Sequence, residues 1–218
     1  MTTAIIGTGT IGTTIARHLV KGGERVLLAG RDDAKAEQVA SELGGSARAT
    51  TVQKAIADAD VIIFAVWLDA MKELIAMHSS GLQGKVVVDP SNPIKPAEGG
   101  KFARTLPDGV SAGKVISGLL PPGTHYVKAF GSLGAEALSS SANRSPSRAA
   151  LLYATDDETA ARQIERLISV AGFDPVKAGG VGDALRMEVF GDLHQFGGLE
   201  GKVPTRDEAA AAVERGRV

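Results

Sequence analysis

The glycine-rich turn near the start of the chain constrains the fold more than any other stretch. An apolar run, Ala4 to Ile6, precedes the sequence Gly7-Thr8-Gly9-Thr10-Ile11-Gly12, and an amphipathic helical pattern and a second apolar run follow it. In such a βαβ unit, Gly7 permits the tight turn, Gly9 lets a pyrophosphate approach the backbone and Gly12 lets the helix pack against the strand. The sequence therefore predicts a dinucleotide-binding unit whose helix N-terminus faces the phosphates. The alternative is a turn that needs its glycines only for folding.

The end of the second strand indicates which dinucleotide is bound. A site for NAD usually carries Asp or Glu there, which binds the ribose 2′-hydroxyl. This strand ends Ala29-Gly30-Arg31, and Asp32 and Asp33 fit the N-cap and first turn of the next helix. Arg31, a planar cation, and Lys35, one helical turn further on, are suited to a 2′-phosphate. We therefore predict NADP rather than NAD; the alternative is that both cations are ordinary surface charges.

The rest of the chain alternates strand and helix patterns, which is typical of a doubly wound, mostly parallel α/β sheet of the Rossmann type. The run from Asp60 to Val66 is apolar after its first residue, as expected for a central strand buried on both faces. Thr155 and Glu158 predict a capping box at one helix start. Residues 94–113 are expected to form an irregular connection and candidate lid, and residues 139–146 a surface loop. Further strands are predicted over 48–51, 85–89, 125–130, 149–153 and 175–178, and helices over 32–43, 52–57, 69–78, 114–120, 155–171, 181–196 and 206–215.

Ligands in such sheets bind outside the carboxyl ends of the strands. The loops 65–68, 90–93 and 130–132 follow strands and are therefore predicted to bind the ligand. Trp67, the only tryptophan, is expected either to wall a flat ring such as a nicotinamide or to pack at the rim. Asn92 is expected either to bind a ribose hydroxyl or a carboxamide, or to serve as a turn residue beside a proline.

A histidine near the end of the predicted helix 181–196 is a further candidate. His194 either donates a proton to a bound substrate or is a partly exposed residue at a helix end. The second interpretation is favoured, because nothing in the sequence pairs this histidine with a carboxylate or a metal. Four residues form the predicted substrate pocket: Trp67, Phe130, Ser132 and His194.

The composition excludes several classes of function. The chain has 218 residues, 44% hydrophobic and 22% charged, and a net charge of −1, so no basic excess favours a nucleic acid. The absence of cysteine excludes disulfides and thiolate chemistry and fits a reducing compartment. No phosphate-loop motif, nucleophile elbow or zinc spacing is present, so no metal is expected. We expect no signal peptide and no contact with a membrane, hence a cytoplasmic protein.

Six segments together resemble a known family. They are Ile5 to Gly12, Gly30-Arg31 with Lys35, the strand end near Trp67, Val127-Lys128-Ala129-Phe130, Tyr153 to Asp157, and Ala178 to Val181. The chain resembles, over about residues 2 to 200, the NADPH-dependent coenzyme F420 reductases and the related reductase domain of the STEAP metalloreductases.

The resemblance implies a compact Rossmann subunit, usually a homodimer, whose C-terminal elements extend the same sheet. We expect a single domain over 1–218, with an NADP-binding core at 1–135 and an extension at 136–218. In the family, hydride passes directly between nicotinamide and deazaflavin, so no catalytic acid or base is required. The implied phosphate-binding residues are Thr8, Gly9, Thr10 and Ile11, the 2′-phosphate lies near Arg31 and Lys35, and the nicotinamide lies near Ala65, Val66, Trp67, Pro90 and Asn92.

The chain departs from the archaeal members at several positions. Gly30 stands where they carry serine, Val66 precedes Trp67 where they carry proline, and residues 130–133 replace a His-Thr-Ile-Pro-like segment. We therefore predict an NADP(H)-dependent oxidoreductase with coenzyme F420 as the leading small-molecule co-substrate. The alternatives are a reductase of a flavin or of a small imine or carbonyl compound, and a non-catalytic module that senses NADPH and binds a protein partner.

Overall fold

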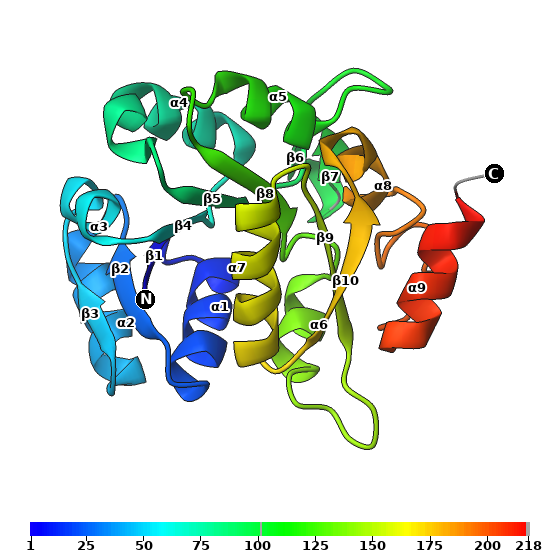
Figure 1. The fold of residues 1–218 in the computed structure, drawn as a ribbon, viewed down its shortest axis with the longest axis horizontal. Coiled ribbons are helices and arrows are strands. Elements are labelled where there is room, and N and C mark those ends of the chain that lie inside the picture. The colour runs from blue at the N-terminus through cyan, green and yellow to red at the C-terminus, as the bar shows by residue number, and fades with distance from the viewer. Residues whose placement is uncertain (101, 217–218) are drawn as a thin grey trace.

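The computed structural model describes residues 1–100 and 102–216. Residue 101, within the predicted connection 94–113, and residues 217–218, at the end of the predicted extension 136–218, lie outside the described residues. An eight-stranded sheet crosses the molecule and carries helices on both faces (Figure 1). The predicted α/β class with a Rossmann-type, mostly parallel sheet is confirmed.

Six neighbouring strands run parallel in the order β3-β2-β1-β4-β5-β8, which is the strand order of dinucleotide-binding sheets. The order reverses between β1 and β4, and such sheets bind ligands outside the carboxyl ends of the strands at this point. The bounds of the six strands are β1 Thr2–Ile6, β2 Arg25–Ala29, β3 Ala47–Ala49, β4 Val61–Phe64, β5 Val86–Asp89 and β8 His125–Ala129.

Two further strands extend this sheet beyond β8. β9 (Ala150–Ala154) pairs antiparallel with β8, and β10 (Asp174–Gly179) pairs parallel with β9. The C-terminal elements therefore lengthen the same sheet, as the resemblance implied. Because β9 and β10 run in the opposite direction, their carboxyl ends lie at the edge away from the carboxyl ends of β1, β4, β5 and β8.

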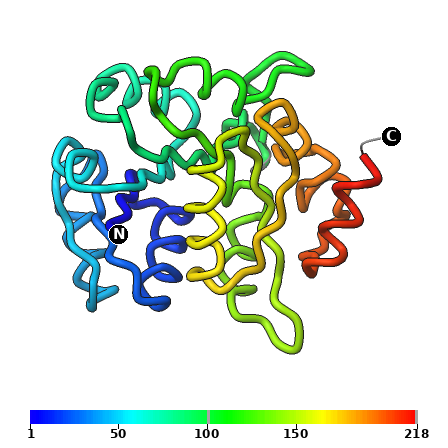
Figure 2. Tube along the Cα trace, viewed as in Figure 1, coloured from blue at the N-terminus to red at the C-terminus, as the bar shows by residue number. Residues whose placement is uncertain are grey.

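Helices cover both faces of the sheet. One apolar cluster joins the sheet to four helices: α1 Thr10–Lys21, α2 Asp33–Leu43, α6 Ala135–Ser140 and α7 Glu158–Val170. The opposite face packs against α3 Val52–Asp58, α4 Leu68–His78 and α5 Ala112–Leu119, and its β9–β10 part packs against α8 Ala184–Met187 and α9 Arg206–Arg215. Figure 2 shows the C-terminal helix, in red, beside β10 and away from the first elements of the chain, in blue. Within the described ranges, none of the helices combines the length and the apolar content needed to span a bilayer.

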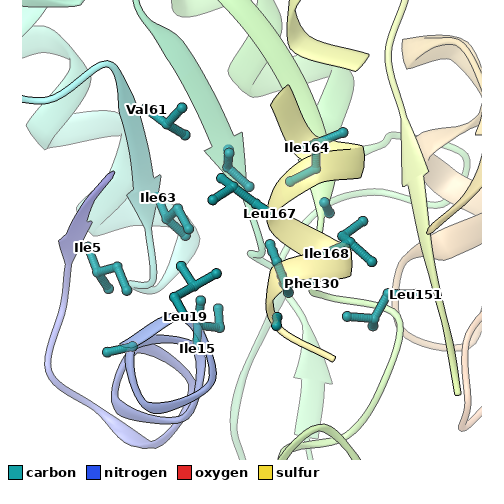
Figure 3. Packing of buried hydrophobic residues seen from close by; sticks show 14 of the residues in the cluster. Ile5, Ile15, Leu19, Val61, Ile63, Phe130, Leu151, Ile164, Leu167 and Ile168 are labelled. Carbon is teal, nitrogen blue, oxygen red and sulfur yellow. The ribbon is translucent and has the colours of Figure 1, made fainter. Parts of the chain in front are cut away.

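The buried strands send alternate side chains to opposite faces of the sheet. Ile5 and Ile63 pack against the face that carries α1 and α7, whereas Ile6 and Phe64 pack against the face that carries α3, α4 and α5. On α1, side chains four residues apart lie on one face of the helix, and Figure 3 shows Ile15 and Leu19 close to Ile5 and Ile63. The unbroken apolar runs of the sequence thus correspond to strands covered on both sides.

The prediction of a helix over 181–196 is wrong. The segment contains a short 3-10 turn, Val181–Asp183, then α8, and from residue 188 onward it folds into successive tight turns. Glycines make these turns possible: a Cβ on Gly191 would lie 2.3 Å from the Arg186 carbonyl oxygen, and one on Gly197 would lie 2.0 Å from the Gly191 carbonyl oxygen. Apolar residues at helical spacing therefore misled the prediction, because backbone contacts that only glycine permits determine this segment.

Three smaller predictions are also corrected. The connection 94–113 is not wholly irregular, since β6 (Ile94–Pro96) and β7 (Phe102–Arg104) form an antiparallel hairpin. The predicted loop 139–146 begins inside α6. The N-cap of α7 is Asp157, whose Oδ1 accepts from the Ala160 amide at 2.8 Å, whereas Thr155 donates its hydroxyl to the Tyr126 carbonyl.

A partly buried ion pair links α7 to the start of β2, at the edge of the sheet opposite the nucleotide-binding turn. The Glu24 carboxylate, just before β2, accepts two hydrogen bonds from the Arg166 guanidinium of α7 at 2.8 and 2.9 Å. Glu24 also accepts from the Thr3 hydroxyl at 2.9 Å, and its side chain is only 5% exposed. This pair anchors α7 across the end of the sheet.

Candidate active site

Two glycines of the β1–α1 turn are required by the protein's own packing. Gly7 has φ +116°, and a Cβ there would lie 2.3 Å from the Ala65 carbonyl oxygen and 2.9 Å from the Val66 Cγ1. A Cβ on Gly12 would lie 1.9 Å from the Gly7 carbonyl oxygen. The turn is therefore pressed against the end of β4, and α1 starts directly beside it.

Gly9 differs from both, because a Cβ there would meet no heavy atom within 4 Å. Its backbone has φ −77° and ψ −174°, which any residue adopts, and it is the exposed N-cap of α1. Neither packing nor backbone conformation explains a glycine at this position, whereas a ligand lying on the turn does. The first turn of α1 has no acidic residue, and its N–H groups have no partners within the helix. Gly9 and the free N–H groups at the start of α1 are therefore suited to bind the pyrophosphate of a dinucleotide.

An open groove of about 660 Å³ runs from this turn along α1. It brings together the predicted residues Thr8, Gly9, Thr10 and Lys35. Sequence reasoning missed Arg17, which lies on the same face of α1 as Thr10 by helical spacing, and it missed the opposite wall because α6 was not predicted. The remaining lining residues are Thr13, Thr14, Ala135, Glu136, Ser139 and Ser140.

The second strand ends as the prediction of an NADP site requires. Asp32 caps α2, its Oδ1 accepting from the Lys35 amide at 3.0 Å, so the predicted N-cap is confirmed. Asp33 lies in the first turn of the same helix. Arg31 is exposed at the end of β2 and is not among the described residues that line the groove, whereas Lys35 is. Binding of a 2′-phosphate by these two cations stays a prediction.

Trp67 lies at the carboxyl end of β4, where the sequence predicted a side chain that packs against a flat ring or at the rim of the site. It is the N-cap residue of α4 and its side chain is 54% exposed. Ala65 and Val66, which precede it, are half-buried and touch the glycine turn. Trp67 is thus accessible to a flat ring that enters at this end of the sheet.

Asn92 connects three segments of the chain. Its Nδ2 donates to the Gly131 carbonyl at 2.9 Å and its Oδ1 accepts from the Val189 amide at 2.7 Å. A Cβ on Gly131 would lie only 2.7 Å from the carbonyl oxygen of the buried Pro90, so these turns are in close contact. For the predicted hydrogen bond to a ribose or carboxamide, Asn92 has left one amide N–H and one lone pair of Oδ1.

The other three residues of the predicted substrate pocket are buried. Phe130 and Ser132 are each 1% exposed, and Phe130 belongs to the hydrophobic core, with φ +64°. In this structure they form the turn after β8 and do not line a surface. Of the four predicted pocket residues, Trp67 alone presents its side chain to solvent among the described residues.

Both expectations for His194 need correction. It is neither a helix-end residue nor exposed, because it lies in the turns after α8 with 1% exposure. Its Nδ1 accepts from the Phe196 amide at 3.0 Å, and the ring also hydrogen-bonds the Gly131 backbone. Burial lowers the pKa of His194 from 6.5 to about 4. A neutral imidazole with both nitrogens occupied is not placed to donate a proton to a substrate.

Residues 2–93 match the family model described as NADP oxidoreductase, coenzyme F420-dependent. Over these residues the chain is similar to this family. A curated relative named F420-dependent NADP reductase, from Methanothermobacter thermautotrophicus, is 32% identical over 148 residues, 63% of this chain and 64% of the relative. The chain therefore spans somewhat less than two thirds of that relative's length.

Solved structures of similar proteins cover more of the chain. A hypothetical protein from Sinorhizobium meliloti is 31% identical, covers 89% of this chain and 93% of its own, and superposes with a TM-score of 0.79. A putative F420-dependent NADP reductase from Arthrobacter sp. FB24 is 22% identical, covers 82% and 85%, and has a TM-score of 0.70, which shows a common fold.

Substitutions of two glycines in the β1–α1 turn are expected to affect folding and NADPH binding separately. Gly9→Val should leave thermal stability nearly unchanged, because its side chain enters open space, and should abolish NADPH binding by filling that space. Gly12→Ala should lower stability, because its Cβ would collide with the Gly7 carbonyl. Thermal melts and calorimetric titration with NADPH check both. A Gly9→Val protein that binds NADPH as the wild type does would show that the turn is purely structural.

The buried histidine predicts an acid sensitivity. His194 takes up a proton near pH 6.5 when unfolded but only near pH 4 when folded, so the unfolding free energy falls as the pH drops between these values. Between pH 7 and pH 5 this histidine should cost about 2 kcal/mol of stability. Urea unfolding of wild type and His194→Gln at both pH values checks it: the variant should lose about 2 kcal/mol less than wild type. An equal loss of unfolding free energy in wild type and variant would mean that a group other than His194 takes up the proton.

Proposed function

We propose that this protein is an NADPH-dependent oxidoreductase that transfers a hydride between NADPH and the deazaflavin coenzyme F420. The observation that carries the proposal is the open space beside Gly9, at the N-terminus of α1, in a stretch that matches a family model described as NADP oxidoreductase, coenzyme F420-dependent. The curated relatives from two Methanothermobacter species carry the name F420-dependent NADP reductase, which supports the same pair of substrates.

The cofactor is proposed to lie across the carboxyl ends of β1, β2 and β4. Backbone N–H groups from Thr8 to Gly12 bind the pyrophosphate, supported by the positive end of the α1 dipole. Arg31 and Lys35 bind the 2′-phosphate, which no carboxylate at the end of β2 opposes. Arg17, on the groove wall, adds a third positive charge near the phosphates.

The reaction end of the site lies between the carboxyl ends of β4, β5 and β8. Bound NADPH supplies a hydride from its nicotinamide ring. Trp67 forms one wall for a flat ring, and the turns at Pro90 and Asn92 form the other. The protein's contribution is to hold two rings within contact distance, so no acid or base is needed. The neutral, buried His194 agrees with this chemistry.

The proposal includes a homodimer located in the cytoplasm. The dimer rests on the resemblance to the F420 reductases, and the location rests on a sequence without cysteine, which fits a reducing compartment.

Consumption of NADPH by the purified protein tests the proposed activity directly. Parallel reactions contain coenzyme F420, FMN, FAD or no acceptor, and each is repeated with NADH, with the nicotinamide absorbance followed over time. We expect rapid oxidation only with NADPH and coenzyme F420 together. Turnover of free FMN or FAD would identify a flavin reductase instead. Tight NADPH binding without turnover in any reaction would contradict the proposed activity and favour an NADPH sensor.

The choice between NADPH and NADH has a separate test. Arg31→Ala should weaken NADPH binding by about 1–3 kcal/mol, roughly 5- to 150-fold, because charged hydrogen bonds to the 2′-phosphate are lost. NADH binding should change little. Arg25→Ala, at the exposed start of the same strand, is the matched control and should affect neither cofactor. An equal loss of affinity for NADPH and NADH would show that Arg31 does not bind the 2′-phosphate.

A further inference from the structure

A buried cluster of charges lies directly behind the reaction end of the site. Lys128 on β8 and Asp89 on β5 are register partners at the carboxyl ends of neighbouring strands. Their side chains are 2% and 0% exposed, and Glu188, which follows α8, is also 0% exposed. Charges in such a position lose much hydration, and apolar residues of similar size often fold as well or better. Stability alone therefore does not account for this cluster.

The Lys128 ammonium is held on the turn that follows β5. It donates to the Ser91 carbonyl at 2.5 Å and to Asp89 Oδ2 at 3.0 Å. Asp89 Oδ1 in turn accepts from the Ser91 amide at 2.8 Å. Tyr126 donates its hydroxyl to Asp89 Oδ2 at 2.8 Å, and burial raises the pKa of this tyrosine well above its usual value, so it stays a donor. Lys128 thus binds the C=O of Ser91, and Asp89 binds its N–H.

Glu188 extends the cluster to two other segments. Its Oε1 lies 3.9 Å from the Lys128 Nζ and accepts from the Ser111 hydroxyl at 2.8 Å and the Gly113 amide at 2.9 Å. The next residue, Val189, donates its amide to Asn92 Oδ1 at 2.7 Å. Two links therefore hold the segment after α8 against the turn after β5, one through Lys128 and one through Asn92.

We propose that Lys128 is a positioning residue for hydride transfer. Its ammonium fixes the turn from Pro90 to Asn92 and, with Glu188, the segment that leans on that turn. Lys128 is buried behind the turn and does not touch either ring. It acts by holding the turn from Pro90 to Asn92, the proposed second wall of the ring site, at a fixed distance from Trp67. This inference rests on the proposed function, because it assigns the turn to the ring-binding end of that site.

Hydride transfer depends steeply on the separation of the two rings, and a displacement of about 1 Å lowers such a rate by roughly 100-fold. The cofactor's phosphates, in contrast, are proposed to bind the glycine turn, Arg31 and Lys35, which the cluster does not touch. Loss of Lys128 is therefore expected to reduce kcat and to leave the Kd for NADPH nearly unchanged.

The experiment compares Lys128→Met with the double variant Lys128→Met/Asp89→Asn. The single variant leaves the buried carboxylates of Asp89 and Glu188 without their cation and is expected to be destabilised. The double variant leaves only the Glu188 carboxylate, which keeps its hydrogen bonds from Ser111 and Gly113, and should fold. We expect kcat with coenzyme F420 to fall roughly 10- to 100-fold in both. Arg166→Met is the control, since it breaks the partly buried ion pair with Glu24 at the opposite edge of the sheet and should lower stability without lowering kcat.

Amide hydrogen exchange provides a readout that needs no turnover. Peptides that cover 89–93 and 186–190 should exchange faster in the double variant than in wild type, whereas a peptide that covers 2–12 should not change. Unchanged exchange in 89–93, or a double variant with wild-type kcat, would overturn the proposal. Failure of the proposed function is distinct, because it would appear in the wild type as absence of turnover with coenzyme F420. Exchange would then still decide whether Lys128 holds the turn after β5 in place.

Discussion

The close approach of the Gly7 backbone to the end of β4 is the constraint on which the rest of the structure depends. It places the start of α1 against Ala65, so that the helix N-terminus opens at the point where the strand order reverses. A side chain on Gly7 or Gly12 would collide with backbone atoms in this contact, whereas the exposed Gly9 faces open space. A helix dipole, free N–H groups and a missing side chain thus coincide at one position, and a bound pyrophosphate accounts for all of them.

The two ends of the proposed site are built on different principles. The phosphate end uses backbone N–H groups and exposed cations, which remain hydrated until a ligand arrives. The reaction end is held from behind by buried groups: Asn92 joins three turns, and the charges of Lys128, Asp89 and Glu188 fasten the same turns below the surface. This division suits a reaction that needs two rings at a fixed separation and no proton transfer. A histidine next to this end, His194, is buried, and burial lowers its pKa to about 4, which agrees with a reaction that needs no proton from it.

The sequence predicted the parts of the molecule that local rules determine. The glycine spacing, the apolar runs of the central strands and the cap at Asp32 depend on neighbouring residues, and the structure has each of them where expected. The segment after Val181 could not be predicted in the same way, because its turns depend on contacts between Gly191, Gly197 and backbone atoms of other residues. The wall formed by α6 was missed because a six-residue helix carries too few apolar positions to show a period. Burial of Phe130 and His194 likewise follows from tertiary packing.

The emission of Trp67 gives the most direct test of this account, because it is the only tryptophan and stands at the proposed nicotinamide end. Titration of the wild-type protein with NADPH should quench this emission to saturation and transfer energy to the nicotinamide. The same titration with NADH should need a higher concentration to reach the same end point. Tight binding of NADPH by calorimetry without any change in Trp67 emission would contradict the account, because the nicotinamide would then lie away from the end of β4.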